Sequence, residues 1–266
     1  MRTTPRRGTI RSTFEQFKSI PGMRKPYSMD GNRRRMLSLL GSLGLLGPLM
    51  MFAGDMLLYY RNVDMEYFGR HFAEIMRDHG SARLAVGGLL GPIAAVFYMA
   101  SFLLAVLLID RRHRRSRIGI FVVFALMMSI GGAYHAQFPM IAFQADAVLA
   151  GVLEAGDAGF AKVAEGYLAL YLYLYLGLGA IAWLWYGVLV GAGRTRLPRW
   201  AVLLTPWVWF WLSGLVAELP QPLNIIVAGG WYNLSYLPLF SLLLIVAWTA
   251  ENRPMDVEPS AASGSA

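Results

Sequence analysis

The stretch ARLAVGGLLGPIAAVFYMASFLLAVLLI at residues 82–109, followed at once by DRRHRRSR at 110–117, decides the class of fold. The first stretch exceeds the roughly 20 apolar residues that a helix needs to cross a hydrocarbon core about 30 Å thick. The arginine run behind it marks a cytoplasmic end, because Lys and Arg that flank a span are retained on that side of the membrane. Together the two stretches predict a transmembrane helix that ends at the cytoplasmic surface.

The rest of the chain repeats this pattern. Hydrophobic residues make up 56% of the 266 residues and charged residues 15%, whereas soluble domains are about 45–50% apolar. The long apolar stretches predict an all-α fold, a polytopic transmembrane helix bundle of about six spans. The predicted spans are residues 36–58, 82–109, 118–143, 167–190, 200–217 and 230–248.

The basic residues set the predicted orientation. Most of the 24 Lys and Arg residues lie before the first span, in the 110–117 and 192–199 loops, or in the tail. An even number of spans with both termini in the cytoplasm places all of these segments on the cytoplasmic side. We therefore expect a multi-pass protein of the cell inner membrane, with the lipid bilayer as its partner. The net charge of +8 is then explained by topology, and no nucleic acid is expected.

Two terminal regions flank the expected transmembrane domain at residues 36–250. Residues 1–35 form a basic cytoplasmic arm, in which Ile10, Phe14, Phe17 and Ile20 recur at helical spacing. This spacing is typical of an amphipathic helix lying on the inner leaflet, and a disordered basic arm is the alternative. Residues 251–266 are rich in Pro, Ser, Ala and Gly and predict a disordered cytoplasmic tail.

The first external loop, at residues 64–80, predicts a helix on the outer surface. Asp64 is placed as its N-cap and Gly80 as its stop. The polar face carries His71, Glu74 and Asp78, which could hold a metal or a polar ligand. Charges at this spacing are more typical of a solvated helix face.

Polar residues at the outer ends of the spans predict a pocket. Ionisable side chains within a bilayer are costly, and those that occur usually face the bundle interior and mark function. Pro139 and Pro238 interrupt helical hydrogen bonding at the same depth, and irregular backbone at membrane depth is tolerated where it lines a cavity. The predicted lining of this outward-facing polar pocket is Asp55, His135, Tyr171, Glu218, Asn224 and Asn233.

The chemistry of this pocket stays open at the level of sequence. His135, Asp55 and Glu218 could bind a divalent metal, or serve as base, acid and orienting group. However, the chain contains no His-Glu-x-x-His motif and no Gly-x-Ser-x-Gly elbow. A lone interior histidine explains His135 at least as well as a ligand role does. An interfacial carboxylate is the favoured explanation of Glu218 and is less favoured for Asp55, which Met56, Leu57 and Leu58 follow. The chain has no cysteine, which excludes disulfides and thiolate metal sites.

Four stretches resemble an uncharacterised family of bacterial six-span integral membrane proteins, and the resemblance covers most of the chain after residue 36. They are GPLMMFAGDMLLYY at 47–60, RLAVGGLLGPIAAVFYMAS at 83–101, GGAYHAQFP at 131–139 and GGWYNLSYLPLFSLLL at 229–244. The resemblance implies no activity. Intramembrane metal hydrolases of the alkaline ceramidase type are a poor match, because they need paired histidines on the last span and this chain has no histidine after His135.

Three functions are compatible with these observations. The first is binding or transport of a small or lipid-like molecule in the outward-facing pocket. The second is an intramembrane enzyme, metal-dependent or not, that acts on a lipid or isoprenoid headgroup. The third is a non-catalytic subunit of a membrane complex, in which the polar residues form an interhelical hydrogen-bond network.

Overall fold

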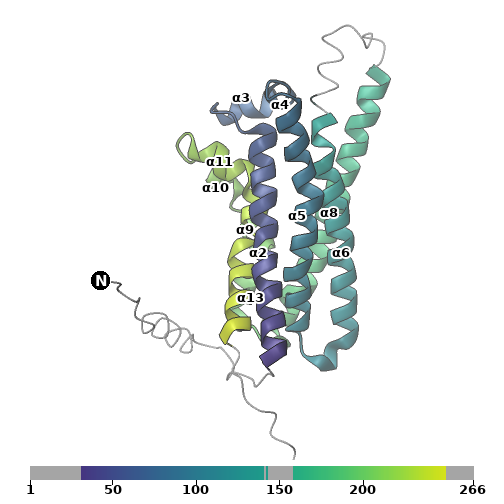
Figure 1. Cartoon of the computed structure of the whole chain (residues 1–266), viewed down its shortest axis with the longest axis vertical. Helices are drawn as coiled ribbons and strands as arrows, with labels where there is room; N and C mark the ends of the chain where they lie inside the picture. Colours follow the sequence, from purple (N-terminus) through teal and green to yellow (C-terminus); the bar gives the residue numbers. More distant parts are fainter. Residues whose placement is uncertain (1–30, 141, 143–157, 250–266) are drawn as a thin grey trace, which may run out of the picture.

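The computed structural model describes residues 31–140, 142 and 158–249, and these residues form an up-and-down bundle of helices (Figure 1). Their only other regular feature is an isolated β-bridge between Ile109 and Thr195. The predicted all-α class is therefore confirmed for the described part of the chain. The long helices of the bundle are α2 (Gly31–Tyr59), α5 (Ser81–Leu107), α6 (Arg114–Ala136), α8 (Ala158–Gly191) and α13 (Leu237–Thr249).

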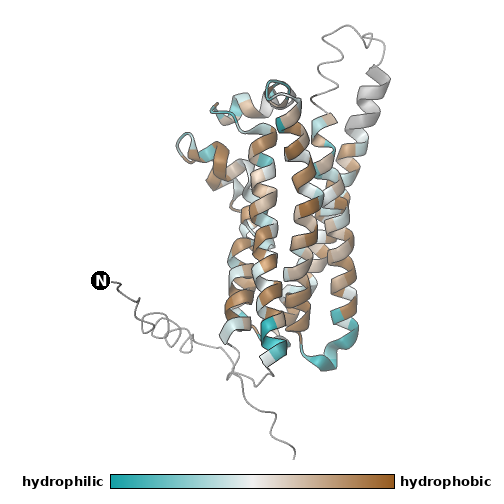
Figure 2. Ribbon diagram, in the orientation of Figure 1, coloured by the Kyte–Doolittle hydropathy of each residue, from teal (hydrophilic) through white to brown (hydrophobic). Residues whose placement is uncertain are grey.

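Five helical segments within the described residues are long and apolar enough to cross a membrane. Hydrophobic residues run along these helices, while hydrophilic residues gather where α5 joins α6 (Figure 2). Part of the predicted 110–117 loop is helical, since η1 (Arg111–His113) leads directly into α6. The five segments are Gly31–Tyr59, Ser81–Leu107, Arg111–Met140, Gly166–Gly191 and Trp231–Thr249.

The predicted span at 200–217 differs from the others, because it forms three short helices instead of one long helix. Thr205 has extended backbone (φ −64°, ψ 139°) directly before Pro206. A proline disfavours helical geometry in the residue before it, so the helix ends there and a new one starts at the proline. The three helices are η3 (Arg199–Leu204), α9 (Pro206–Phe210) and α10 (Ser213–Ala217).

The last predicted span, at 230–248, is also interrupted. Its first part is α12 (Trp231–Leu234), preceded by α11 (Leu223–Gly229), and α13 begins only at Leu237. Pro238 lies in the first turn of α13, where a proline needs no hydrogen-bond partner for its nitrogen. Helix α12 contacts α2 through Asn233, which donates a hydrogen bond to Asp55.

The two ends of the described chain lie at the same end of the bundle (Figure 1). Arg34 on α2 donates a hydrogen bond from Nη2 to the carbonyl oxygen of Trp248 on α13, at 2.6 Å. The arginine-rich turns lie at this end too, where the backbone nitrogen of Asp110 donates to the carbonyl oxygen of Arg194 at 2.9 Å. We call it the arginine end, and the opposite end the pocket end.

Helices α2 and α5 approach closely through small residues. A Cβ atom added at Gly47 would lie 2.7 Å from the backbone nitrogen of Tyr98, and one added at Gly44 would collide with the side chain of Ser101. Small residues at such contacts let two helices pack backbone to backbone, which stabilises association where lipid offers no hydrophobic drive. Helices α2 and α5 therefore form a closely packed pair within the bundle.

The core is aromatic and lies toward the arginine end and the middle of the bundle. Phe102 on α5 stacks on Phe124 of α6 with ring centroids 4.2 Å apart and planes 4° from parallel. Both side chains are fully buried. Trp183 of α8 and Phe240 of α13 pack against Phe102, at centroid distances of 5.8 and 5.5 Å. One cluster therefore joins four of the long helices.

The external segment at 64–80 forms two short helices, α3 (Met65–Arg70) and α4 (Phe72–Arg77), where the sequence predicted one. The predicted cap is confirmed, because the backbone nitrogen of Tyr67 donates to Asp64 Oδ1 at 2.6 Å. Gly80 adopts a positive φ of 76° before α5, as its predicted role as a stop requires. The predicted amphipathic helix in the arm, and the predicted disordered tail at 251–266, lie outside the described residues.

Candidate functional site

A cavity of about 520 Å³ lies at the pocket end of the bundle, between the long helices and the short helices α3, α11 and α12. Its walls are mainly apolar and aromatic, with a few polar groups from three different helices, as is usual for small-molecule sites. The residues that line it are Met51, Asp55, Tyr59, Phe68, Met128, Gly131, Tyr134, His135, Phe138, Leu172, Tyr175, Ala228, Gly229, Tyr232 and Asn233.

The polar part of the cavity is a network centred on Asp55. His135 Nε2 on α6 lies 3.2 Å from Asp55 Oδ1, and Asn233 Nδ2 on α12 donates to Asp55 Oδ2 at 2.6 Å. Tyr98 on α5 donates from its hydroxyl to Asn233 Oδ1 at 3.0 Å. This donation turns the Asn233 amide so that its NH₂ group faces Asp55. Four helices thus meet in one chain of hydrogen bonds.

Glycines on two helices make room for the His135 ring. A Cβ atom at Gly91 would lie 2.6 Å from His135 Nδ1, and one at Gly54 would lie 2.9 Å from Cε1. The ring is therefore held between α2 and α5 and can turn only if these helices move apart. Asp55 and His135 are 6% and 5% exposed, so both groups are removed from bulk solvent.

The hydrogen bonds of His135 indicate its tautomer. Nδ1 is buried and has no hydrogen-bond partner among the described residues, and it faces the backbone of α5 at Gly91. A protonated Nδ1 would leave a buried N–H group unsatisfied, which is costly. The geometry therefore favours the neutral imidazole with its proton on Nε2, donating to Asp55.

Tyrosines surround this network. Tyr59 lies one helical turn after Asp55 on α2, and its hydroxyl donates to the carbonyl oxygen of Gly229, which ties α2 to α11. The hydroxyls of Tyr175 on α8 and Tyr236 are 3.2 Å apart. These bonds give the phenol groups partners, and the side chains of Tyr59 and Tyr175 line the cavity.

The structure brings together three of the six residues predicted to line a pocket: Asp55, His135 and Asn233. The other three lie elsewhere. The Tyr171 hydroxyl bonds that of Tyr167 at 2.8 Å, Glu218 is exposed at the end of α10, and Asn224 is buried with its Oδ1 accepting from the backbone nitrogen of Ile225 at 2.7 Å. None of these three is among the residues that line the cavity.

A metal site built from His135, Asp55 and Glu218 would need these three groups to converge. Within the described residues, no group of three or more His, Asp or Glu side chains is placed to hold a metal ion. Only Asp55 and His135 of the predicted set are in contact, and Glu218 on α10 is not among the residues around them.

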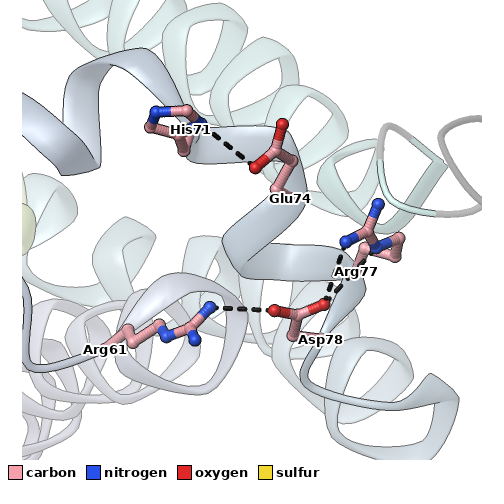
Figure 3. A network of polar contacts seen from close by, with 5 residues as sticks. All are labelled: Arg61, His71, Glu74, Arg77 and Asp78. Carbon is pink, nitrogen blue, oxygen red and sulfur yellow. Dashed lines mark hydrogen bonds and ion pairs between the residues drawn. The ribbon is translucent and has the colours of Figure 1, made fainter.

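The polar face of α4 likewise forms ion pairs that separate its acidic groups (Figure 3). His71 Nδ1 lies 3.0 Å from Glu74 Oε2, whereas Asp78 binds Arg61 at 2.8 Å and Arg77 at 3.3 Å. Slight desolvation raises the pKa of Asp78, but the hydrogen bonds from Arg61 and Arg77 outweigh it and hold this pKa below its usual value.

The sequence reasoning missed several residues of the site. Tyr59 follows Asp55 at the i+4 position, so the two side chains share one face of the helix. This spacing could have predicted Tyr59 as a residue of the site. Tyr167, Tyr171 and Tyr175 are spaced four residues apart, and of these three only Tyr175 lines the cavity. Tyr98 gave no signal, because its contact with Asn233 joins residues 135 positions apart.

The fold and the site together define a helical protein with long apolar helices and a buried carboxylate network beside a cavity at one end. The chain belongs to the family of unknown function DUF6796, which matches residues 29–250. This confirms the predicted resemblance to an uncharacterised family. No curated protein and no solved structure matches the chain.

Proposed function

We propose that this protein is an inner-membrane protein that crosses the bilayer six times and binds a small or lipid-like molecule in a pocket open to the outer side. The segment from η3 to α10 is the fifth crossing, made of short helices. Arg34 meets Trp248 at the arginine end, as an even number of crossings requires. The basic residues at this end then place both ends of the described chain on the cytoplasmic side. The pocket end then lies toward the outside.

The observation that carries this proposal is the cavity of about 520 Å³ beside a buried carboxylate. A buried polar network usually fills its own space with side chains, whereas this one borders an open volume. The cavity size falls within the range of small-molecule sites. Its apolar walls suit an alkyl chain or an aliphatic ring, and Asp55 and Asn233 provide polar recognition.

Binding is a better account of the network than catalysis by His135. In a carboxylate–histidine dyad, the carboxylate holds one ring nitrogen and the other nitrogen exchanges protons with the substrate. Here Asp55 holds Nε2, and Nδ1 faces Gly91 on α5. The nitrogen that would act as a base is therefore turned away from the cavity.

The proposed orientation can be tested by cysteine labelling, because the chain has no cysteine of its own. Tyr232→Cys places a thiol at the cavity wall and Arg115→Cys places one at the arginine end. In intact spheroplasts, a membrane-impermeant maleimide should label the first variant and leave the second unlabelled until the membrane is permeabilised. The reverse pattern would overturn the orientation.

Ligand binding can be tested by filling the cavity. Ala228→Trp adds a large ring to the cavity wall, and Ile181→Trp adds the same ring to a side chain of α8 that is 55% exposed and outside the cavity. Mass spectrometry of solvent extracts should find a molecule at close to one per protein in the wild type and in Ile181→Trp. It should be depleted in Ala228→Trp. Equal recovery from all three proteins would contradict binding in the cavity.

A further inference from the structure

We infer that the cavity selects a molecule with a cationic amine or quaternary ammonium group, for which Asp55 is the counter-ion and the surrounding aromatic rings form a cage. This inference rests on the proposed function and names the chemical class of its ligand. It follows from the charge balance of the cavity, from the hydrogen bonds of His135 and from the composition of the walls.

The charge balance of the cavity wall is negative. Among the described residues that line the cavity, Asp55 is the one carboxylate, and none is Lys or Arg. Arg83 lies on the neighbouring helix, but its guanidinium donates to the backbone carbonyls of Leu57, Met56 and Tyr60 and is not part of the wall. The charge of the carboxylate is thus left to its hydrogen-bond partners, which are His135, Asn233 and the uncharged hydroxyl of Tyr59.

Neither Asn233 nor His135 cancels this charge. Asn233 donates through an uncharged amide. His135 would cancel the charge only as an imidazolium, and that form would bury an N–H group at Nδ1 for which the described residues offer no acceptor. Two neutral donors stabilise a carboxylate in its charged form but leave the net charge in place. A buried charge of this kind is stable when an opposite charge comes within a few ångströms of it.

The walls of the cavity suit a cation more than a neutral polar group. Six aromatic side chains line it, and the negative face of an aromatic ring attracts ammonium groups. Met51, Met128 and Leu172 supply apolar surface for the remainder of the ligand. The six aromatic residues are Tyr59, Phe68, Tyr134, Phe138, Tyr175 and Tyr232.

The same features argue against an anionic ligand. Phosphate and carboxylate groups are bound by Arg, Lys or clusters of backbone N–H groups. No basic side chain lines the cavity in the described part of the chain, and the donors His135 and Asn233 are already directed at Asp55. A molecule that carried a negative group would bring a second negative charge beside Asp55.

The test uses three probes that share a six-carbon chain: hexyltrimethylammonium, hexanol and hexanoate. Each is titrated by calorimetry into the full-length protein in an uncharged maltoside detergent. The wild type should bind hexyltrimethylammonium about tenfold or more tightly than hexanol, and hexanoate should not bind. This comparison needs no variant, so the inference can fail even if every substitution disrupts folding.

Two variants test whether Asp55 supplies the negative charge that binds the cation. Asp55→Asn keeps the shape of the side chain and should weaken hexyltrimethylammonium about tenfold or more while leaving hexanol within about twofold. His135→Gln should not raise the affinity for the cation, because a neutral histidine does not compete with it for the charge of Asp55. A rise of tenfold or more in His135→Gln would mean that His135 is the native counter-ion, and it would overturn the inference.

The two proposals fail in different ways. If hexanol binds as tightly as the cation, and Ala228→Trp abolishes both, the cavity binds ligands but the cation inference is wrong. If no probe binds, and solvent extracts of the wild type contain no stoichiometric molecule, the proposed binding function itself is wrong. Retained cation affinity in a folded Asp55→Asn protein would also overturn the inference.

Discussion

The two halves of the bundle differ in how they are filled. Around Phe102 and Phe124, long continuous helices meet and aromatic rings stack with no exposed surface. At the pocket end, α2 faces the short helices α11 and α12, and a cavity of about 520 Å³ remains between them. The contrast indicates that this fold leaves space where its helices are short and interrupted.

Breaks in the helices also bring polar side chains to the cavity. The breaks at Pro206 and before Pro238 divide much of the last third of the chain into short helices. One of these, α12, carries Asn233, which donates a hydrogen bond to Asp55. A continuous helix would keep its backbone donors and acceptors satisfied and would fill the space with side chains. The hollow half is therefore the half in which polar groups can be reached by a ligand.

The largest expected effect is the loss of a ring from the filled half. Phe102→Ala should lower the free energy of unfolding by about 3–5 kcal/mol, because a fully buried aromatic side chain is replaced by a cavity. Phe138→Ala, at the cavity wall, should cost less than half as much, since its ring already borders open volume. Apparent thermal midpoints in detergent measure the difference. Equal losses would remove the distinction between the two halves.

A smaller effect is expected from overpacking the α2–α5 contact. Gly44→Leu should destabilise the protein by about 1–3 kcal/mol, because the added side chain must displace Ser101. Gly177→Leu is the matched control, since nothing lies within 4 Å of a Cβ atom at that position on α8. Thermal midpoints of the two variants should separate clearly, and a control as unstable as Gly44→Leu would argue against close packing as the cause.

The hydrogen-bond network predicts a smaller effect on stability than on binding. Tyr98→Phe removes the donor to Asn233 Oδ1 and should cost about 0.6 kcal/mol, the usual value for hydrogen bonds between membrane helices. Because the Asn233 amide is then free to turn, the affinity for hexyltrimethylammonium should change by about twofold or more. Tyr186→Phe, whose hydroxyl bonds only a backbone carbonyl, should leave that affinity unchanged.

The smallest effect concerns the external segment and its pH dependence. Partial burial, together with nearby Arg83 and Arg61, lowers the pKa of His79 below its usual value of about 6.5. The unfolded chain therefore binds a proton more readily than the folded one. The stability contributed by neutral His79 is present above pH of about 6.5 and is lost as the pH falls through the lower folded pKa.

Thermal midpoints measured between pH 5 and pH 7 check this expectation. The wild type should lose more stability on acidification than His79→Gln, which cannot take up the proton. A wild-type slope equal to that of the variant would show that His79 does not contribute. Asp78 titrates below this range, because its pKa is lowered by the arginines that bind it.

The sequence by itself determined the helical class, most of the long helices and three residues of the site. Long apolar runs fix helices, because backbone groups in a low-dielectric environment must be satisfied within their own segment. Charge rules placed Asp55 and His135 at similar depth, and prolines marked the broken backbone near Asn233. The Asp64 cap and the Gly80 turn followed from local chemistry alone.

Only the tertiary structure decided which groups meet. The sequence placed Glu218 and Asn224 beside the same pocket, but neither is among the residues that line the cavity. Glu218 is exposed at the end of α10, and Asn224 is buried on α11. The contact of Tyr98 with Asn233 and the fit of His135 against Gly91 join segments far apart in the chain. Depth in a membrane follows from local composition, whereas rotation about each helix axis is set by packing against its neighbours.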